Sequence, residues 1–155
     1  MDSYLLVKTL HILSATILFG TGIGIAFFMF RSVFTNDTKL KLFAANNTVF
    51  ADYLFTLPAV IIQPVTGFWL VWQAGYNWTD SWLLISYFLY ILAGLCWIPV
   101  VWIQIQLRKI ITDSVDTGEE LPPRYYRLFK TWFLLGWPAF ISLLIIFYLM
   151  VAKPA

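Results

Sequence analysis

His11 is the only histidine in the 155-residue chain. It lies about two helical turns inside a long apolar segment, one turn after Lys8. An ionisable side chain at such a depth in a membrane segment is costly, and so it indicates a functional site. Imidazole can ligate a metal or haem iron, carry a proton, or hydrogen-bond a quinone carbonyl. The residue therefore predicts a place for chemistry and leaves the reaction open.

The composition around this histidine is that of an integral membrane protein. Hydrophobic residues make up 61% of the chain and charged residues only 12%, against about one quarter charged in an ordinary soluble domain. Four apolar stretches are long enough to cross a membrane. We expect an all-α fold, an integral membrane four-helix bundle that occupies residues 1–155 as a single domain. The expected spans are residues 4–30, 50–72, 82–107 and 129–151.

The basic residues predict the orientation of the bundle. Eight of the ten Lys and Arg residues fall within residues 31–49 and 108–130, and residues 73–81 carry none. Lys and Arg are retained on the cytoplasmic side, so we expect both termini to face outward. The net charge of +2 is small and gives no indication of a nucleic-acid partner. Cys96, the sole cysteine, is expected to be a small buried apolar residue.

Glycines in the first span offer two interpretations. Gly20 and Gly24 form a GxxxG pair, which most often lets another helix approach closely. The same open backbone can admit a flat cofactor ring. Spacing alone does not separate these two interpretations.

Polar residues in the second span also have two interpretations. Pro58 and Pro64 each free a backbone carbonyl, which we expect Thr56, Gln63 and Thr66 to satisfy. Alternatively, the polar residues line a pocket, because counting along the helices places five polar groups in one layer of the outer half. This layer consists of His11, Gln63, Thr66, Tyr90 and Ser142.

Several runs together resemble a bacterial family described only as predicted integral membrane proteins of unknown function. The resemblance covers essentially the whole chain, and it implies a multi-pass protein of the bacterial cytoplasmic (inner) membrane. The runs that carry it are residues 8–12, which include His11, residues 56–67, residues 82–83, and residues 126–154.

More remotely, the same landmarks are similar to the HemJ-type protoporphyrinogen oxidases, membrane proteins that bind haem b and oxidise a porphyrinogen. This resemblance implies an oxidoreductase in which His11 ligates the haem iron, Lys8 lies beside it and Arg31 follows the first helix. The chain has Leu84 and Ser86 where that family has His and Lys. The resemblance therefore implies a haem held by His11 as its one protein ligand, or by two His11 side chains, one from each chain of a homodimer.

Two functions follow from these observations. In the first, haem b or a quinone occupies a redox pocket in the outer half of the bundle, formed by His11, Lys8, Gln63 and Thr66. In the second, the protein is a non-catalytic accessory, binding or small transport component, and His11 is hydrogen-bonded between helices. The sequence does not decide whether the protein is an enzyme, and it names no substrate or electron partner.

Overall fold

The computed structural model describes residues 2–154, and within them the chain is helical apart from its short connections. Four of its helices are long and apolar enough to cross a membrane, so the expected all-α membrane fold is confirmed. The elements are α1 (Ser3–Ser32), α2 (Thr38–Ala51), the π-helical turn η1 (Asp52–Thr56), α3 (Leu57–Ala74), α4 (Ser81–Thr117) and α5 (Pro123–Ala152). Of these, α2, η1 and α3 form one continuous helix.

The helices are longer than the apolar stretches from which we expected them. The second helix begins at Thr38 rather than near residue 50, and α4 continues to Thr117 rather than ending near residue 107. A helix does not have to end where the hydrocarbon ends, provided that capping and packing support it. Asp37 supplies such a cap, because its carboxylate accepts hydrogen bonds from two backbone N–H groups in the first turn of α2.

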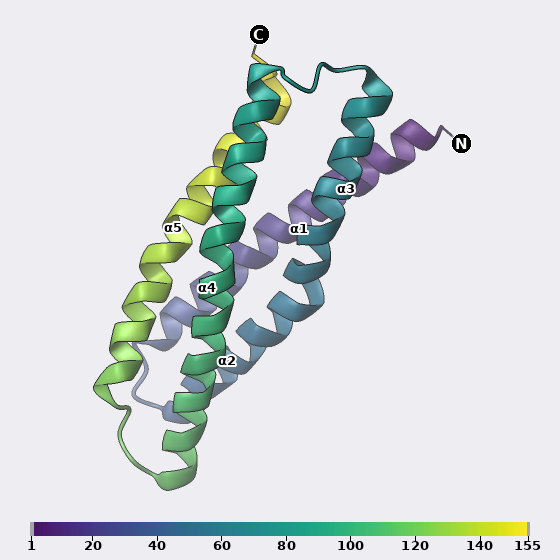
Figure 1. Ribbon diagram of the computed structural model, residues 1–155. Coiled ribbons are helices and arrows are strands. Elements are labelled where there is room, and N and C mark those ends of the chain that lie inside the picture. Colours follow the sequence, from purple (N-terminus) through teal and green to yellow (C-terminus); the bar gives the residue numbers. More distant parts are fainter. Residues whose placement is uncertain (1, 155) are drawn as a thin grey trace.

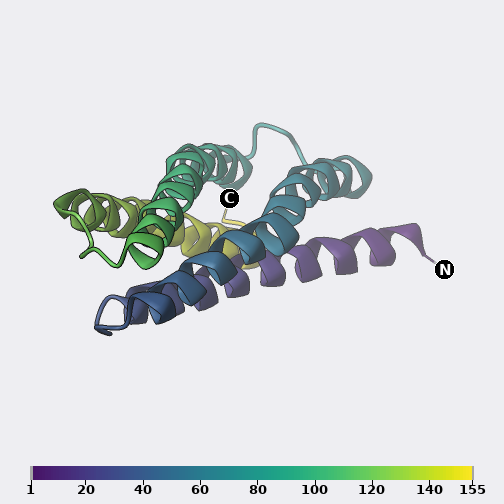
Figure 2. The same ribbon diagram turned by 90° about the horizontal axis from the view of Figure 1, so that it is seen from below.

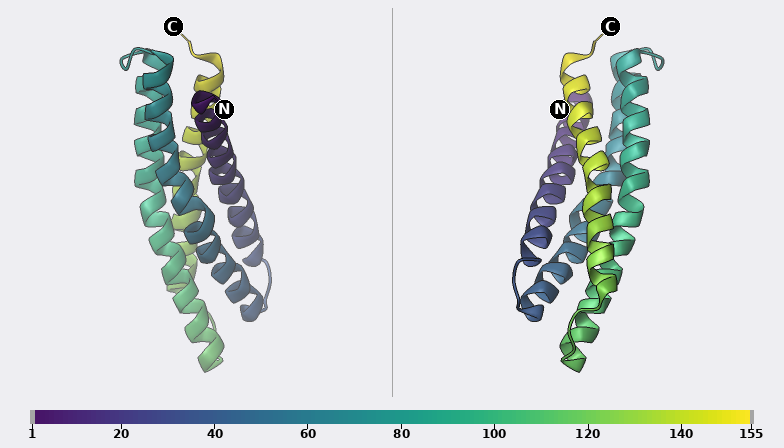
Figure 3. Two further views of the ribbon diagram at one scale, coloured as in Figure 1. Left: turned by 90° about the vertical axis from the view of Figure 1, so that its right-hand side faces the viewer. Right: turned by 90° about the vertical axis from the view of Figure 1, so that its left-hand side faces the viewer.

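The four long helices form two pairs (Figure 1; Figure 2). One pair is α1 with the α2–α3 helix, and the other is α4 with α5; the pairs meet chiefly where α2 packs against α4. Both termini lie at one end of the bundle with the α3–α4 connection, and the other two connections lie at the opposite end (Figure 3). We call these the terminal end and the basic end, since the latter carries most of the Lys and Arg residues.

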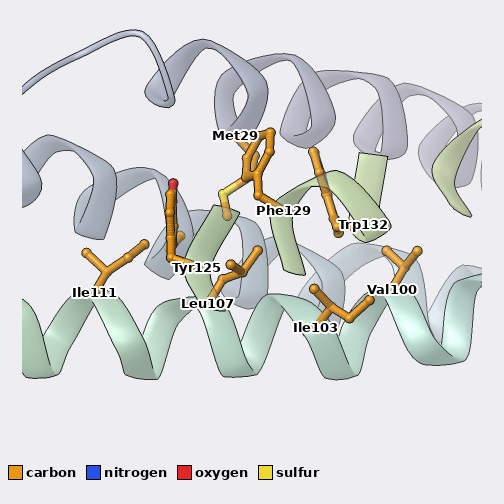
Figure 4. Close-up of a cluster of buried hydrophobic side chains, with 9 residues drawn as sticks. Met29, Val100, Ile103, Leu107, Ile111, Tyr125, Phe129 and Trp132 are labelled. Carbon is orange, nitrogen blue, oxygen red and sulfur yellow. The ribbon is translucent and has the colours of Figure 1, made fainter. Parts of the chain in front are cut away.

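A buried apolar cluster closes the bundle toward the basic end (Figure 4). All four long helices contribute to it, and Met29, Leu107 and Tyr125 are fully buried there. Lys41 is buried near this cluster, and its Nζ donates hydrogen bonds to the carbonyls of Ser32 and Val33 at 3.1 and 2.9 Å. The lysine therefore satisfies carbonyls at the end of α1 that have no partner in their own helix.

Pro64 frees the carbonyl of Val60, one helical turn before it in α3. The hydroxyl of Tyr90, on α4, donates a hydrogen bond to this carbonyl at 2.6 Å. This bond links α3 to α4 across the interior of the bundle. Our expectation that Thr56, Gln63 and Thr66 satisfy the freed carbonyls is therefore wrong at Val60, because a longer side chain from the facing helix reaches it. Gln63 and Thr66 bond to other groups, and Thr56 Oγ1 has no partner among the described residues.

The π-helical turn η1 lies just before the other proline of this helix. Pro58 has no N–H to donate to the preceding turn, and the backbone there adopts the wider hydrogen-bond pattern, with the N–H of Leu57 bonded to the carbonyl of Asp52. Single π-helical turns inside α-helices occur frequently at functional sites. Here the turn holds both Asp52 and Thr56 on the buried face.

The GxxxG pair does not pack against another helix of this chain. A Cβ atom built on Gly20 or Gly24 would meet no other side chain or helix within 4 Å. The expectation of a close helix contact at these glycines is therefore wrong within the monomer.

The orientation of the bundle can be tested by cysteine labelling from either side of the membrane. Cys96 is first replaced by Ala, and a single cysteine is then placed at Asn77 in the α3–α4 connection or at Glu119 in the α4–α5 connection, both exposed. We expect a membrane-impermeant maleimide to label Asn77→Cys in intact cells and Glu119→Cys only after the cells are opened, because Lys and Arg favour the cytoplasm. The reverse pattern would show that the basic end faces outward.

Candidate functional site

His11 lies between α1 and α3, where it takes part in a small polar cluster. Its Nδ1 atom is 2.7 Å from the Oγ1 atom of Thr66. The amide of Gln63 donates to the backbone carbonyl of His11 at 2.7 Å and also contacts the hydroxyl of Ser14. We call His11, Ser14, Gln63 and Thr66 the His11 cluster. Sequence reasoning placed three of these four side chains in one layer, and the structure brings those three together.

The hydrogen bonds of Thr66 determine which nitrogen of His11 carries the proton. The Thr66 hydroxyl has one hydrogen, which it donates to the carbonyl of Ile62 at 2.7 Å. Toward His11 it can therefore only accept, so Nδ1 of the neutral imidazole carries the hydrogen and Nε2 keeps its lone pair. That arrangement leaves Nε2 available as a metal ligand or a hydrogen-bond acceptor.

Gly67 allows the imidazole to approach the backbone of α3. A Cβ atom at this position would lie 3.3 Å from Cε1 of His11, closer than an ordinary van der Waals contact. In this chain the glycine that lets helices approach closely is thus Gly67, not the GxxxG pair of the first span.

The other residues that we expected in this region make contacts of their own. Lys8 lies one helical turn before His11 on α1; it is exposed, and its Nζ lies 5.8 Å from the ring centroid of Tyr4. Tyr90 bonds to Val60, and Ser142 is buried on α5 without a hydrogen bond to the His11 cluster among the described residues. Of the five polar groups that we expected in one layer, three therefore belong to the His11 cluster, and the other two make no hydrogen bond to it among the described residues.

A cavity of about 330 Å³ lies between the four long helices, on the basic-end side of the His11 cluster. Most of its wall is apolar, and aromatic side chains from α1, α4 and α5 contribute much of it. Val100 and Trp132 belong both to this wall and to the buried cluster that closes the basic end. His11 does not line the cavity. The cavity and the imidazole are therefore two separate sites.

One end of the cavity is polar. Asp52 is only 3% exposed, and Thr56, Gln104 and Trp97 surround its carboxyl group. These three side chains lie close enough to act on the carboxyl group as hydrogen-bond donors, but Asp52 Oδ2, Thr56 Oγ1, Trp97 Nε1 and Gln104 Oε1 have no partner with hydrogen-bond geometry among the described residues. We call these four residues the Asp52 cluster.

Most of the buried polar side-chain atoms that have no hydrogen-bond partner lie at this cavity. Seven buried side-chain polar atoms of the described residues have no partner, and five of them belong to cavity-lining residues: the four of the Asp52 cluster and Trp132 Nε1. Each unsatisfied buried group costs about 1–3 kcal/mol. Five together would cost roughly as much as the whole stability of a typical domain, about 5–15 kcal/mol. This end of the cavity is therefore where the described residues have the most capacity for further hydrogen bonds.

Sequence reasoning missed the Asp52 cluster, although the signal that identifies it was present. Asp52 lies two residues inside the second expected span, and an ionisable residue within a membrane span is costly, as His11 is. Because Asp52 lies near the edge of the apolar stretch, it was not recognised as an ionisable residue inside the membrane. Gln104 occupies the corresponding place near the end of the third expected span. Nothing in the sequence indicates that these two residues face each other.

The hydrogen bond between His11 and Thr66 can be tested by two substitutions of nearly equal size. Thr66→Val removes the hydroxyl, and we expect it to cost about 1 kcal/mol and to lower Tm by about 2–4 °C for a chain of this length. Thr66→Ser keeps the hydroxyl and should retain most of that stability. Thermal unfolding of the purified protein in detergent, followed by size-exclusion chromatography, measures both. Equal Tm values for Thr66→Val and wild type would mean that the bond does not stabilise the α1–α3 contact.

Comparison with known proteins identifies the family and no activity. No curated protein and no solved structure matches the chain, so the more remote resemblance to the HemJ-type oxidases stays an expectation. One family profile, described as "Predicted integral membrane protein (DUF2269)", matches residues 5–154. This match and the four membrane-length helices agree with the family of unknown function that the sequence resembles. The chain belongs to this family of predicted integral membrane proteins.

Proposed function

We propose that this protein binds a lipophilic small molecule inside the membrane, with the apolar body of the ligand in the central cavity and its polar end at the Asp52 cluster. The observation that carries the proposal is the concentration of unpartnered buried polar atoms at one end of an otherwise apolar cavity. Such a site resembles ligand pockets in general, which are mainly apolar with a few polar groups that fix orientation. This is a binding role, in line with the second of the two functions suggested by the sequence.

Water alone accounts for only part of the site. A buried water molecule needs two to four polar partners, which only the Asp52 end offers. The rest of the wall, including Phe19, Phe140 and Leu143, has nothing to hold water. A lipid chain would fit that apolar part, but it would leave the Asp52 cluster unsatisfied. A molecule with both a polar end and an apolar body would fill the apolar part and offer a partner to Asp52.

Filling the cavity tests this proposal. Gly94 lines the cavity, and a Cβ atom there would meet nothing within 4 Å, so Gly94→Leu places a side chain into open space. We expect it to weaken binding of 2-phenylethanol, a one-ring probe, about tenfold or more, because the displaced ring loses about 1.5–3 kcal/mol of burial. Binding is followed by tryptophan fluorescence in phosphatidylcholine nanodiscs, since Trp97, Trp132 and Trp137 line the cavity.

Gly20→Leu is the matched control for this measurement. The position is exposed on α1, it does not line the cavity, and a Cβ atom there also meets nothing within 4 Å. The control should bind the probe as wild type does. Equal binding by Gly94→Leu and Gly20→Leu would show that the probe does not occupy the cavity, and the proposal would fail.

A second candidate function, binding of haem b at His11, is favoured by one observation. The Nδ1 hydrogen bond to Thr66 leaves Nε2 with a free lone pair, which is the arrangement of a metal-ligating histidine oriented by a second residue. This tautomer suits an iron ligand better than a quinone, whose carbonyl needs a donor. Because His11 does not line the central cavity, such a haem would lie against the α1–α3 pair or between two chains of a homodimer.

The haem candidate is tested by the absorption spectrum of protein expressed with ample haem supply. If haem is bound, we expect a Soret band in the wild type and its loss in His11→Ala, since no other imidazole exists in the chain. A monodisperse elution profile serves as the folding control. Haem content that is unchanged in His11→Ala would rule out His11 as the ligand, and absence of the band from the wild type would leave cavity binding as the proposed function.

A further inference from the structure

Asp52 is a buried acid without a cation beside it. Its Oδ2 atom has no hydrogen-bond partner among the described residues. The buried Lys41 lies about 16 Å away along the same helix, and its Nζ is already bonded to the carbonyls at the end of α1. A carboxylate inside a membrane protein normally pairs with a positive charge or faces a pathway for one. Among residues 2–154, no Lys or Arg side chain bonds to Asp52 Oδ2.

We propose that the polar end of the ligand is a cationic amine whose ammonium group pairs with Asp52. The inference rests on the proposed binding function and assigns the chemical class of its ligand. Three of the unpartnered atoms in the Asp52 cluster are oxygens: Asp52 Oδ2, Thr56 Oγ1 and Gln104 Oε1. An ammonium group has three N–H donors and no acceptor, so one primary amine can complete all three.

The aromatic wall supports a cation at the same place. Trp97 and Trp132 come from α4 and α5 and line the cavity, and an indole face attracts a cation through its quadrupole, most strongly when water is excluded. Trp97 is also one of the side chains that surround the carboxyl group of Asp52. An anionic head group would instead be repelled by Asp52, and a hydroxyl would bring a single donor for three oxygens.

The size of the cavity limits the body of the ligand. A volume of about 330 Å³ lies at the lower end of the range for ligand pockets, roughly 300–1,000 Å³. Gly22, Gly94 and Gly136 line it without contributing a side chain. The site therefore fits an amine with one or two rings, or a short branched chain, rather than a full lipid.

The experiment compares two probes of the same shape, 2-phenylethylamine and 2-phenylethanol, which differ only in the head group. Wild-type protein is placed in nanodiscs of phosphatidylcholine, a lipid of zero net charge, so that the membrane itself does not attract the amine. Tryptophan fluorescence gives the Kd of each probe at neutral pH, where the amine is protonated. We expect the wild type to bind the amine at least tenfold more tightly than the alcohol.

Asp52→Asn keeps the shape of the side chain and removes its charge, so this variant should bind the two probes with Kd values within about threefold of each other. Asp116→Asn, an exposed acid on α4, is the matched control and should keep the wild-type preference. Equal affinity of the wild type for both probes would overturn the amine assignment, as would an unchanged preference in Asp52→Asn. The wild-type comparison gives this answer even if Asp52→Asn does not fold. If the probes do not bind in the cavity at all, Gly94→Leu will leave the binding of 2-phenylethanol unchanged. This result distinguishes failure of the proposed binding function from failure of the amine assignment.

Discussion

Hydrocarbon offers no hydrogen-bond partner, so the polar groups of four membrane helices have to be satisfied inside the protein. Several long-range contacts of this bundle meet that requirement. Tyr90 satisfies the carbonyl freed by Pro64, Lys41 satisfies the last carbonyls of α1, and Thr66 accepts from His11. Each contact joins two helices or two ends of a connection. The hydrogen bonds that satisfy polar groups therefore also hold the helices together. Among the described residues, four of the seven buried polar side-chain atoms that have no partner belong to the Asp52 cluster.

The two polar clusters have different physical characters, and this difference decides which one is the better candidate for binding. In the His11 cluster every interaction is local to the α1–α3 contact, and one side chain completes the next. That is how a group that stabilises a helix pair behaves. In the Asp52 cluster, one buried oxygen of the carboxyl group and three polar atoms around it have no partner among the described residues, beside an apolar cavity and on a π-helical turn. This spare hydrogen-bonding capacity is the reason that we place the proposed ligand there and not at His11.

The sequence predicted the fold well because the bilayer makes length and hydropathy decisive. It predicted His11 with Gln63 and Thr66 for a similar reason, since depth can be counted along a straight helix. It did not predict the partner of the freed Val60 carbonyl or the meeting of Asp52 with Gln104, because these depend on how neighbouring helices are rotated about their axes. The GxxxG pair was misleading for the same reason: spacing gives the face of a helix, not what lies opposite it.

The account depends most on the claim that a molecule from outside the chain completes the Asp52 cluster. An experimental structure of the protein purified in lipid, at a resolution that shows ordered water, tests it directly. The account predicts density in the cavity that no protein atom explains, with a polar atom within hydrogen-bonding distance of Asp52 Oδ2 and continuous density along the apolar wall. A cavity that holds no such density, with Asp52 Oδ2, Thr56 Oγ1 and Gln104 Oε1 all bonded to other atoms of the chain, would contradict it.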